Sequence, residues 1–385
     1  MMPGNDRKIK ILFIVTSCRK SGPTQQLYNI IRNLDFTTFN AMMITLYKED
    51  EEQSQINFFG ELLKVKKVPT TKIQILTGFD FMLKKIIRKY EPDIIHSHGV
   101  FPDFAVSKIM PQRQIHTIRN YMWEDYIDKY GKIVGNFFVY LSLYTIKKAK
   151  LSLVCSSSLS NLYKKNKSID IEYIRNGVNT EKYKIVNQDE KKQLRNSLDM
   201  PKNAFIFVYT GSFLPRKNIP FLCEVFENEF KDDKNTILLL LGDGVEKSML
   251  EKRYASMKNM IFLGNKRNVD NYLNASDFFI SSSKSEGLPN SVLEAISSGL
   301  PVILSDIPQH LEILEEGKKL GEIGYSFKLN DKEDLAKIMK SVIKSKVIDS
   351  EICRRVACEL FDSKTVSREY QSRYLEIWKQ EHAKK

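Results

Sequence analysis

The stretch FIFVYTGSFLPRKNIPFLCEVFENEFKDDKNTILLLL, residues 205–241, decides the fold. It predicts a buried strand over 205–210, a loop at Gly211, a helix over 219–230 and a second buried strand over 236–241. Two strands joined through a helix run parallel in one sheet. Further predicted strands extend this unit into a doubly wound parallel sheet, and they cover residues 260–263, 277–282 and 301–304.

The N-terminal half shows the same alternation of strands and helices, which again predicts a parallel sheet covered on both faces. Its predicted helices cover 23–34 and 79–90, and its predicted strands cover 8–16, 41–47, 93–96, 114–119 and 151–156. The apolar run 133–149 is too short to span a bilayer, and it fits either a core helix or a surface that meets lipid headgroups. The polar stretch 187–203 is interpreted as a linker.

Length and composition agree with two folded domains. A chain of 385 residues exceeds what one core usually serves, and its 42% hydrophobic content excludes a disordered chain. The five cysteines form no CxxC pair, which argues against a disulfide framework and favours a reducing compartment. The apolar run 11–15 is too short for a signal peptide or a membrane span. We therefore expect a cytoplasmic protein.

The net charge of +13 is unevenly distributed. Residues 1–190 hold 29 Lys and Arg against 19 Asp and Glu, whereas residues 191–385 hold 31 against 28. The basic clusters of the first half fit either solvated helix faces or one binding face, and they lie at 64–67, 84–89, 147–150 and 164–167. Because no nucleic-acid-binding signature is present, we expect an anionic membrane surface as partner and no nucleic acid.

The segment SKSEGLPNSVLEAISSGLP, residues 283–301, carries the most chemical information. It follows a predicted strand and opens a helix, whose first amides and positive dipole end suit a diphosphate. Two carboxylates eight residues apart, Glu286 and Glu294, could accept hydrogen bonds from sugar hydroxyls on either side of an anionic centre. The alternatives are a solvated loop acid for Glu286 and a capping box between Ser291 and Glu294.

This E-x7-E spacing, together with GSFLPRK at 211–217, NGV at 176–178 and HSHG at 96–99, resembles the GT4 family of retaining glycosyltransferases. The resemblance runs along nearly the whole chain. It implies a GT-B fold, an α/β architecture of two doubly wound parallel-sheet (Rossmann-like) domains facing a central cleft. Residues 1–180 with a C-terminal helix at 365–385 would form an acceptor-side, membrane-facing domain, and 181–364 the domain that binds the nucleotide sugar.

The resemblance also implies roles for individual residues. Glu286 would bind donor-sugar hydroxyls, Glu294 the ribose, and Lys217 with Arg216 the diphosphate. Other residues of the predicted donor site are Gly22, Gly211, Ser212, Gly287, Leu288, Pro289, Asn290 and Ser291.

Two departures from the family pattern affect the predicted site. Ser212 stands where the family commonly has arginine, so Arg216 or another base must substitute. His116 sits early in its strand, which leaves Arg119 or Asn120 to face the site, and His98 is the other candidate near the acceptor.

The predicted reaction is retaining transfer of a hexose or N-acetylhexosamine from a UDP-sugar to a membrane-linked glycan, during assembly of a bacterial capsule, O-antigen or wall polymer. Because the sequence has no D-x-D triplet, we expect no bound metal and no cofactor. The enzyme would lie peripherally on the inner face of the membrane. A nucleotide-sugar epimerase on the same fold, or a non-catalytic protein that binds membranes or nucleic acid, are the alternatives.

Overall fold

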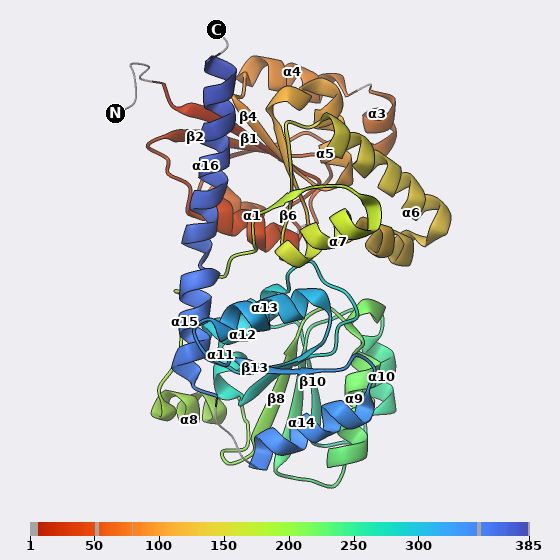
Figure 1. Cartoon of the computed structure of the whole chain (residues 1–385), viewed down its shortest axis with the longest axis vertical. Helices are drawn as coiled ribbons and strands as arrows, with labels where there is room; N and C mark the ends of the chain where they lie inside the picture. Colours follow the sequence, from red (N-terminus) through yellow and green to blue (C-terminus); the bar gives the residue numbers. More distant parts are fainter. Residues whose placement is uncertain (1–6, 51–53, 79, 345–347, 384–385) are drawn as a thin grey trace. The chain divides into compact units, whose positions relative to one another are not determined.

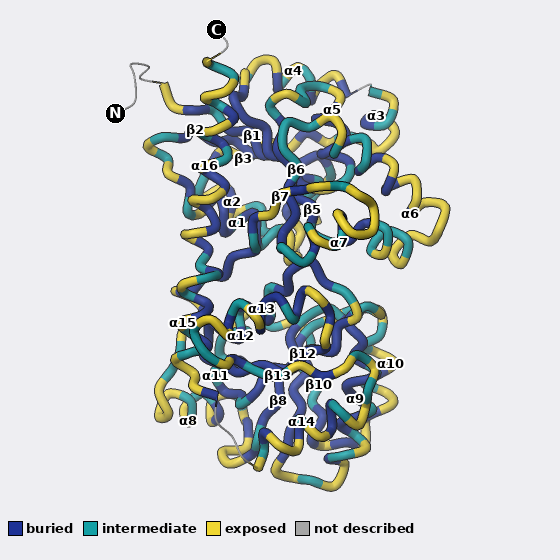
Figure 2. The backbone as a smooth tube through the Cα atoms, viewed as in Figure 1, coloured by how far each residue is buried: buried dark blue, intermediate teal, exposed yellow. Residues whose placement is uncertain are grey.

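The computed structural model describes residues 7–50, 54–78, 80–344 and 348–383, which fall into two compact units (Figure 1). Unit 1 comprises the described residues up to Arg175 together with those from Ser363 onward. Unit 2 comprises Asn176–Asp362. Each unit is built on one parallel sheet, with its central strands buried and its helices partly exposed (Figure 2). The predicted class, two doubly wound α/β domains, is confirmed.

The described part of unit 1 has a seven-stranded sheet in the order β3-β2-β1-β4-β5-β6-β7. Every neighbouring pair is parallel, and Val15 at the end of β1 pairs with His98 at the end of β4. The strands are β1 (Ile9–Val15), β2 (Phe39–Thr45), β3 (Lys64–Lys67), β4 (Ile94–His98), β5 (Gln114–Ile118), β6 (Leu151–Val154) and β7 (Glu172–Tyr173).

Alternate residues of β1 face two separate apolar cores, because successive side chains of a strand point to opposite faces. Ile11 and Phe13 pack with α1 and α16, whereas Leu12 and Ile14 pack with α3, α4, α5 and α6. The helices of unit 1 are α1 (Gly22–Arg32), α2 (Ile56–Gly60), α3 (Lys72–Thr77), α4 (Phe81–Tyr90), α5 (Val100–Ile109), α6 (Met122–Lys148), α7 (Ser157–Lys167) and the C-terminal α16 (Ser363–His382), with a short 3-10 turn η1 (Pro111–Arg113).

The lysine cluster at 64–67 does not lie on a helix face. It forms the edge strand β3, with Lys64, Lys66 and Lys67 exposed and Val65 packed toward the core. Lysines on an edge strand discourage pairing with a strand from another molecule. The strand was missed because three lysines in four residues hide the usual alternation of apolar and polar residues.

Unit 2 has, within its described residues, a six-stranded parallel sheet in the order β10-β9-β8-β11-β12-β13. Its helices and turns are α8 (Gln188–Ser197), η2 (Pro215–Lys217), α9 (Ile219–Phe230), α10 (Lys247–Arg253), α11 (Val269–Ala275), α12 (Asn290–Ser297), α13 (Pro308–Lys318), α14 (Lys332–Lys344) and α15 (Ser350–Leu360). Its strands are β8 (Phe205–Thr210), β9 (Thr236–Leu241), β10 (Met260–Gly264), β11 (Phe278–Ser281), β12 (Val302–Ser305) and β13 (Gly324–Phe327).

The predicted linker over 187–203 is wrong, because most of it is the helix α8 of unit 2. Asn187 and Glu190 form a capping box that starts this helix. Arg195 is buried and donates to the carbonyl oxygens of Ala275 and Ala204 and to the carboxylate of Asp277. Lys191 of the same helix also donates to the Ser276 carbonyl and to Asp277. This polar helix is therefore fixed to unit 2 by two cations rather than by an apolar face.

Among the described residues, no helix combines the length and the apolar character that crossing a membrane requires. None of the five cysteines, all of which lie within the described residues, forms a disulfide bond.

Candidate functional site

Three loops at the carboxyl ends of neighbouring strands of unit 2 are joined by backbone hydrogen bonds. The Gly211 amide donates to the Leu241 carbonyl at 3.0 Å, and the Gly242 amide donates to the Gly264 carbonyl at 2.9 Å. A side chain at Gly242 would bring its Cβ within 1.7 Å of the Gly211 carbonyl oxygen, so only glycine fits there. The predicted loop at Gly211 and Ser212 therefore belongs to a cluster of three closely packed loops. This cluster lies at the carboxyl ends of the strands, where open parallel sheets bind ligands.

Glu286 lies beside this cluster, in the loop between β11 and α12, and only 7% of it is exposed. Its carboxylate accepts hydrogen bonds from Ser283 Oγ at 2.7 Å and from Arg216 at 3.0 Å, and it also pairs with the Lys217 ammonium. Glu286 is therefore not a solvated loop acid. The structure brings together three of the predicted site residues, although they are 69 and 70 positions apart in the chain.

The electrostatics of this cluster keep Glu286 ionised. Burial alone would raise the pKa of its carboxyl, but the charges of Lys217 and Arg216 outweigh that effect and hold the pKa well below its ordinary value. Burial also lowers the pKa of Lys217, and the attraction of Glu286 opposes this change. A buried carboxylate with two cations makes the cluster a charged site inside unit 2.

Backbone contacts fix the two cations at this place. Ser282, directly after β11, donates to the carbonyl oxygens of Lys217 and Asn218 at 3.1 and 3.0 Å. The Lys284 amide donates to the Arg216 carbonyl at 2.7 Å. The 3-10 turn η2, which carries both cations, is thereby tied to the loop that carries Glu286.

His310 is a further member of this region that the sequence did not indicate. Ser305 Oγ donates to the Ser283 carbonyl at 2.6 Å, so the Nδ1 proton of His310 is the donor to Ser305. Burial lowers the pKa of His310 to about 4, and the nearby Glu286 carboxylate opposes this. His310 Nε2 therefore presents a lone pair, and it has no hydrogen-bond partner among the described residues.

The turn from Leu288 to Asn290 opens α12, and Asn176 holds it in place. The Asn176 side-chain amide donates to the Leu288 carbonyl at 2.8 Å and to Asn290 Oδ1 at 3.0 Å. Pro289 occupies the N-cap position, and no side chain caps the helix there. The alternative capping box between Ser291 and Glu294 is therefore wrong, because Ser291 already lies inside the helix.

Glu294 projects from α12 and accepts a hydrogen bond from the Tyr183 hydroxyl. Burial, followed by the charge of Glu294, raises the pKa of Tyr183, which stays protonated and serves as the donor. Arg354 fixes Tyr183 by donating to its carbonyl oxygen and to the carbonyl oxygen of Ser297 on α12. Glu294 is thus positioned by a tyrosine that the sequence analysis did not consider.

The remaining predicted residues, His98, Arg119 and Gly22, lie in unit 1. His98 ends β4, and its ring lies 4.1 Å from that of His96, measured between centroids. Burial, more than the nearby Arg119 charge, lowers the pKa of both histidines, so they are neutral near pH 7. Gly22 is the first residue of α1 and is exposed.

A hydrogen-bond network of hydroxyl groups and Arg119 surrounds these histidines. His96 Nδ1 lies 2.7 Å from the Tyr374 hydroxyl, and Thr117 Oγ1 lies 3.2 Å from the Tyr370 hydroxyl. Arg119 hydrogen-bonds Tyr370. His116 is held in the core by Ser152 at 2.8 Å, so it does not replace His98 at the strand end.

The two sheets with their loop-edge sites define a class of protein, the two-domain glycosyltransferases of GT-B fold. A sequence model of the family described as "Glycosyltransferase Family 4" matches residues 21–182, and one described as "Glycosyl transferases group 1" matches residues 190–357. The chain belongs to this GT4-type family of glycosyltransferases.

Individual relatives agree with this assignment. The chain is 27% identical to the UDP-Gal:alpha-D-GlcNAc-diphosphoundecaprenol alpha-1,3-galactosyltransferase of Escherichia coli, over 71% of this chain and 72% of the relative. It is 24% identical to the E. coli O-antigen biosynthesis glycosyltransferase WclY, over 97% and 99% of the two chains. The structure of Anabaena HepE in complex with UDP and glucose shares the fold, with a TM-score of 0.78 over 96% of this chain and 100% of that one, at 16% identity. The protein is a glycosyltransferase with relatives in bacterial polysaccharide biosynthesis.

Proposed function

We propose that this protein transfers a hexose or N-acetylhexosamine from a UDP-sugar to a lipid-linked glycan acceptor, with retention of anomeric configuration, in assembly of a bacterial surface polysaccharide. One observation carries the proposal: the buried Glu286 carboxylate is fixed by Ser283, Arg216 and Lys217 beside the start of α12. Such an arrangement places acceptor oxygens for sugar hydroxyls next to cations for a diphosphate.

In this proposal each group has one task in donor binding. The Glu286 carboxylate accepts hydrogen bonds from donor-sugar hydroxyls, and Glu294, held by Tyr183, accepts them from the ribose. The diphosphate lies at the start of α12, where no side chain caps the helix and the dipole is positive. A lysine ammonium has three donors, so Lys217 can bind the diphosphate while it stays paired with Glu286.

The proposed chemical step breaks the bond between the anomeric carbon and the diphosphate oxygen. Negative charge then grows on the leaving diphosphate, and Lys217 and Arg216 stabilise it because they are already in place. The acceptor hydroxyl attacks the same face of the sugar, and its proton passes to the leaving diphosphate oxygen. These cations make the step independent of a bound metal.

Unit 1 would bind the acceptor. His98 and Arg119 lie together at the carboxyl ends of its strands, and they are the groups we assign to acceptor binding. Because His98 is neutral near pH 7, it can donate or accept a hydrogen bond without adding charge. The E. coli relative named for a diphosphoundecaprenol acceptor supports a lipid-linked substrate here, and with it a peripheral location on the cytoplasmic face of the membrane.

Turnover of Glu286→Gln tests this assignment. The amide keeps the shape of the side chain but removes the charge, and we expect transfer to fall about 100-fold or more. Glu224→Gln is the matched control, because Glu224 forms an exposed ion pair with Lys332 and should lose nothing. Both variants are compared with wild type in UDP release from UDP-galactose, UDP-glucose and UDP-N-acetylglucosamine, with a lipid extract present as the source of the lipid-linked acceptor. Unchanged UDP release by Glu286→Gln would remove the assignment.

The epimerase alternative is separated by incubating the enzyme with a UDP-sugar alone. A transferase leaves the sugar configuration unchanged, whereas an epimerase produces a new one. The family membership disfavours the epimerase.

A further inference from the structure

The outer end of α6 exposes a cluster of large apolar side chains. Ile133 is 89% exposed and Tyr140 is 63% exposed. The other members of the cluster are Tyr130, Val134 and Phe137. An exposed apolar patch of this kind marks an interaction site in a folded protein.

The fold holds this cluster in a fixed geometry. Gly131 has φ of +77°, so α6 reverses there and its two halves pack against each other. The contact is close at Gly135, where an added Cβ would lie 2.7 Å from the Tyr126 carbonyl oxygen. Phe138 is buried against Tyr130 and Phe101, with ring centroids 4.8 and 5.5 Å apart. The second half of α6 therefore has one core face and one exposed apolar face. The core-helix alternative for 133–149 is confirmed, and contact of the other face with lipid headgroups stays a prediction.

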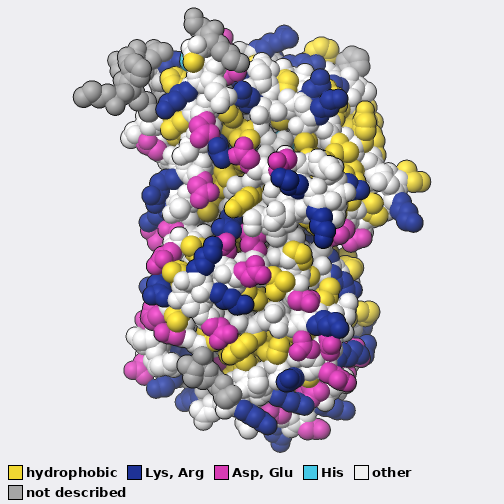
Figure 3. All heavy atoms as spheres, in the orientation of Figure 1, with side chains coloured by type: hydrophobic (Ala, Val, Ile, Leu, Met, Phe, Trp, Pro, Cys, Tyr) yellow, Lys and Arg dark blue, Asp and Glu magenta, His cyan; other side chains and the backbone are white. Residues whose placement is uncertain are grey.

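Neighbouring helices continue this apolar surface. Ile73 on α3 is 72% exposed, and Phe81 and Met82 on α4 are also exposed. Helices α3, α4 and α6 pack with α5 over the same core, so they cover one side of the unit 1 sheet. In Figure 3, hydrophobic and basic side chains gather at the projecting end of α6.

The charge of this surface is predominantly positive. By sequence, residues 72–77, 81–90 and 132–148 contain eight lysines and arginines and no acidic residue, and the first half of α6 adds two exposed acids, Glu124 and Asp128. Lysines beside exposed aliphatic and aromatic side chains suit a bilayer interface, where the apolar groups enter the acyl boundary and the cations meet anionic headgroups.

We propose that the exposed side of α3, α4 and α6, called here the α6 face, docks on an anionic lipid bilayer with Ile133 and Phe137 inserted into its interface. This inference deepens the proposed function, since it rests on the acceptor being held at a membrane. Charge complementarity selects the occupant, because the excess of lysines and arginines attracts anionic headgroups and would add nothing to contact with a neutral apolar protein partner.

Vesicle sedimentation of the full chain tests the apolar part. We expect binding to vesicles of phosphatidylcholine mixed with phosphatidylglycerol and much weaker binding to phosphatidylcholine alone. Ile133→Glu should weaken binding to the anionic vesicles about tenfold or more, because it places a carboxylate among acyl chains. Met249→Glu on α10 of unit 2 is the matched control, since Met249 is also exposed. It should bind as wild type does.

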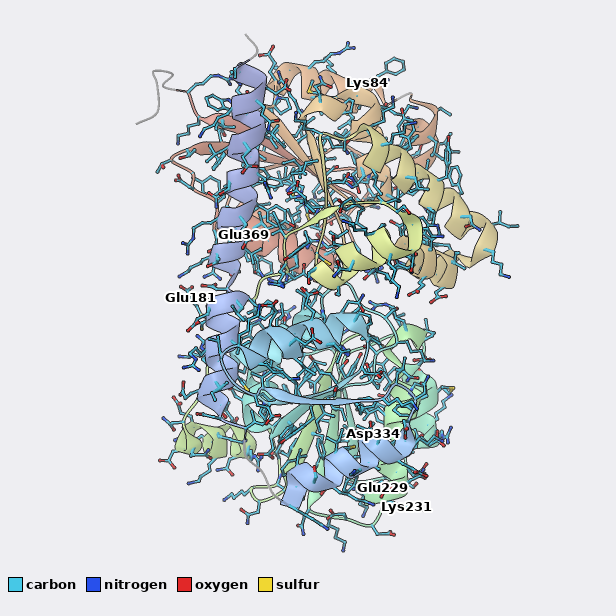
Figure 4. All side chains as sticks on the ribbon, viewed as in Figure 1. Lys84, Glu181, Glu229, Lys231, Asp334 and Glu369 are labelled. Atoms are coloured by element: carbon cyan, nitrogen blue, oxygen red, sulfur yellow. The ribbon has the colours of Figure 1, made fainter. Side chains whose placement is uncertain are left out.

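The basic part is tested by neutralising two lysines on one face of α4. Lys85→Gln with Lys89→Gln should weaken binding about fivefold for each lysine removed. The control pair, Lys231→Gln with Lys234→Gln, removes two exposed lysines of unit 2 and should change nothing. Figure 4 labels Lys84, the neighbour of the tested residues on α4, and Lys231 of the control pair. Added salt should weaken wild-type binding steeply.

Several outcomes would overturn the proposal. These are equal binding to both kinds of vesicle, no binding to either, or Ile133→Glu binding as wild type does. Self-association that sedimentation velocity shows to be lost in Ile133→Glu would instead assign the α6 face to a second copy. UDP binding and UDP release by Ile133→Glu are measured separately in the absence of vesicles. If UDP binding and UDP release are retained but the wild type does not bind vesicles, the docking proposal is wrong and the proposed function stands.

Discussion

Unit 2 buries a carboxylate with two cations at the carboxyl ends of its strands, whereas unit 1 buries two uncharged histidines beside one arginine, Arg119, at the same edge of its own sheet. In unit 2 the Glu286 carboxylate is bound by two cations and stays ionised. In unit 1 burial keeps His96 and His98 uncharged. Tyrosine and threonine hydroxyls hydrogen-bond His96, whereas His98 Nε2 has no hydrogen-bond partner among the described residues. Two sheets of the same class therefore carry different kinds of site.

The difference follows from what each site is proposed to bind. A diphosphate needs fixed positive charge, and the cations that provide it need a carboxylate when the site is empty, because unpaired buried charges are costly. A neutral glycan hydroxyl needs hydrogen-bonding groups, which uncharged histidines and one arginine can provide without a buried carboxylate. The comparison predicts that the two units respond differently to loss of a charge and to acid.

The largest expected effect is that of Lys217→Met. Removing this cation leaves Glu286 buried with one partner fewer, and we expect a loss of about 3–5 kcal/mol in the free energy of unfolding. Both tryptophans, Trp123 and Trp378, lie in unit 1, so their fluorescence follows that unit. Circular dichroism follows both units, and it should show unfolding that begins at a lower urea concentration than in wild type. The transition followed by fluorescence should be unchanged.

The matched control for this variant is Lys332→Met. It breaks the exposed pair with Glu224 and should leave both transitions in place. An unchanged circular dichroism transition in Lys217→Met would mean that the buried pair contributes little.

Acid should destabilise unit 1 more than unit 2. A histidine whose pKa is lowered in the folded state takes up a proton more readily when unfolded, so stability falls as the pH drops below about 6.5. His96 and His98 in unit 1 each contribute up to about 1.4 kcal/mol per pH unit, and unit 2 has His310 with a pKa of about 4. Between pH 7 and pH 5, the urea midpoint followed by tryptophan fluorescence should fall more than the midpoint followed by circular dichroism. A smaller shift there than in circular dichroism would contradict the neutral character of the unit 1 site.

A smaller effect is expected of Tyr183→Phe. This change removes the hydroxyl that donates to Glu294 and should weaken UDP binding about tenfold, the value of one hydrogen bond to a charged group. Tyr140→Phe is the control, because Tyr140 is exposed in unit 1. If Glu294 binds the ribose hydroxyls, Tyr183→Phe should lose less affinity for 2′,3′-dideoxy-UDP, which lacks these hydroxyls, than for UDP. Calorimetry measures both affinities. An equal loss for both ligands would assign Tyr183 to stability alone.

The smallest expected effect is that of chelation. Because Lys217 and Arg216 supply the proposed positive charge, EDTA should leave the rate of UDP release unchanged. A rate that falls with EDTA and returns with Mg²⁺ or Mn²⁺ would contradict metal-independent transfer.

Continuous apolar runs made much of the fold predictable. The strand over 205–210, the helix over 219–230 and the strand over 236–241 are confirmed at the predicted residues, because glycine, proline and asparagine mark their ends. The edge strand β3 and the helix α8 were missed, since lysines and other polar residues obscure their periodicity. In both cases tertiary contacts, rather than local pattern, decide the structure.

Less of the candidate site than of the fold could be predicted from the sequence. Glu286 and Lys217 were selected as ligand-binding residues, but their pairing joins positions far apart in the chain, and no local pattern encodes it. His310 and Tyr183 carried no signal, because one histidine on a helix and one tyrosine after a turn are ordinary core residues. Their roles depend on which loops meet at the sheet edge.

The most direct test of the central claim is calorimetric binding of UDP and of UDP-sugars to wild type and to Glu286→Gln. The sugars are galactose, glucose and N-acetylglucosamine, with GDP as the control nucleotide. The wild type should bind one UDP-sugar about tenfold or more tightly than UDP, and Glu286→Gln should lose this difference while it still binds UDP. Failure of the wild type to bind any of these nucleotides, or an undiminished preference for the sugar in Glu286→Gln, would contradict the account.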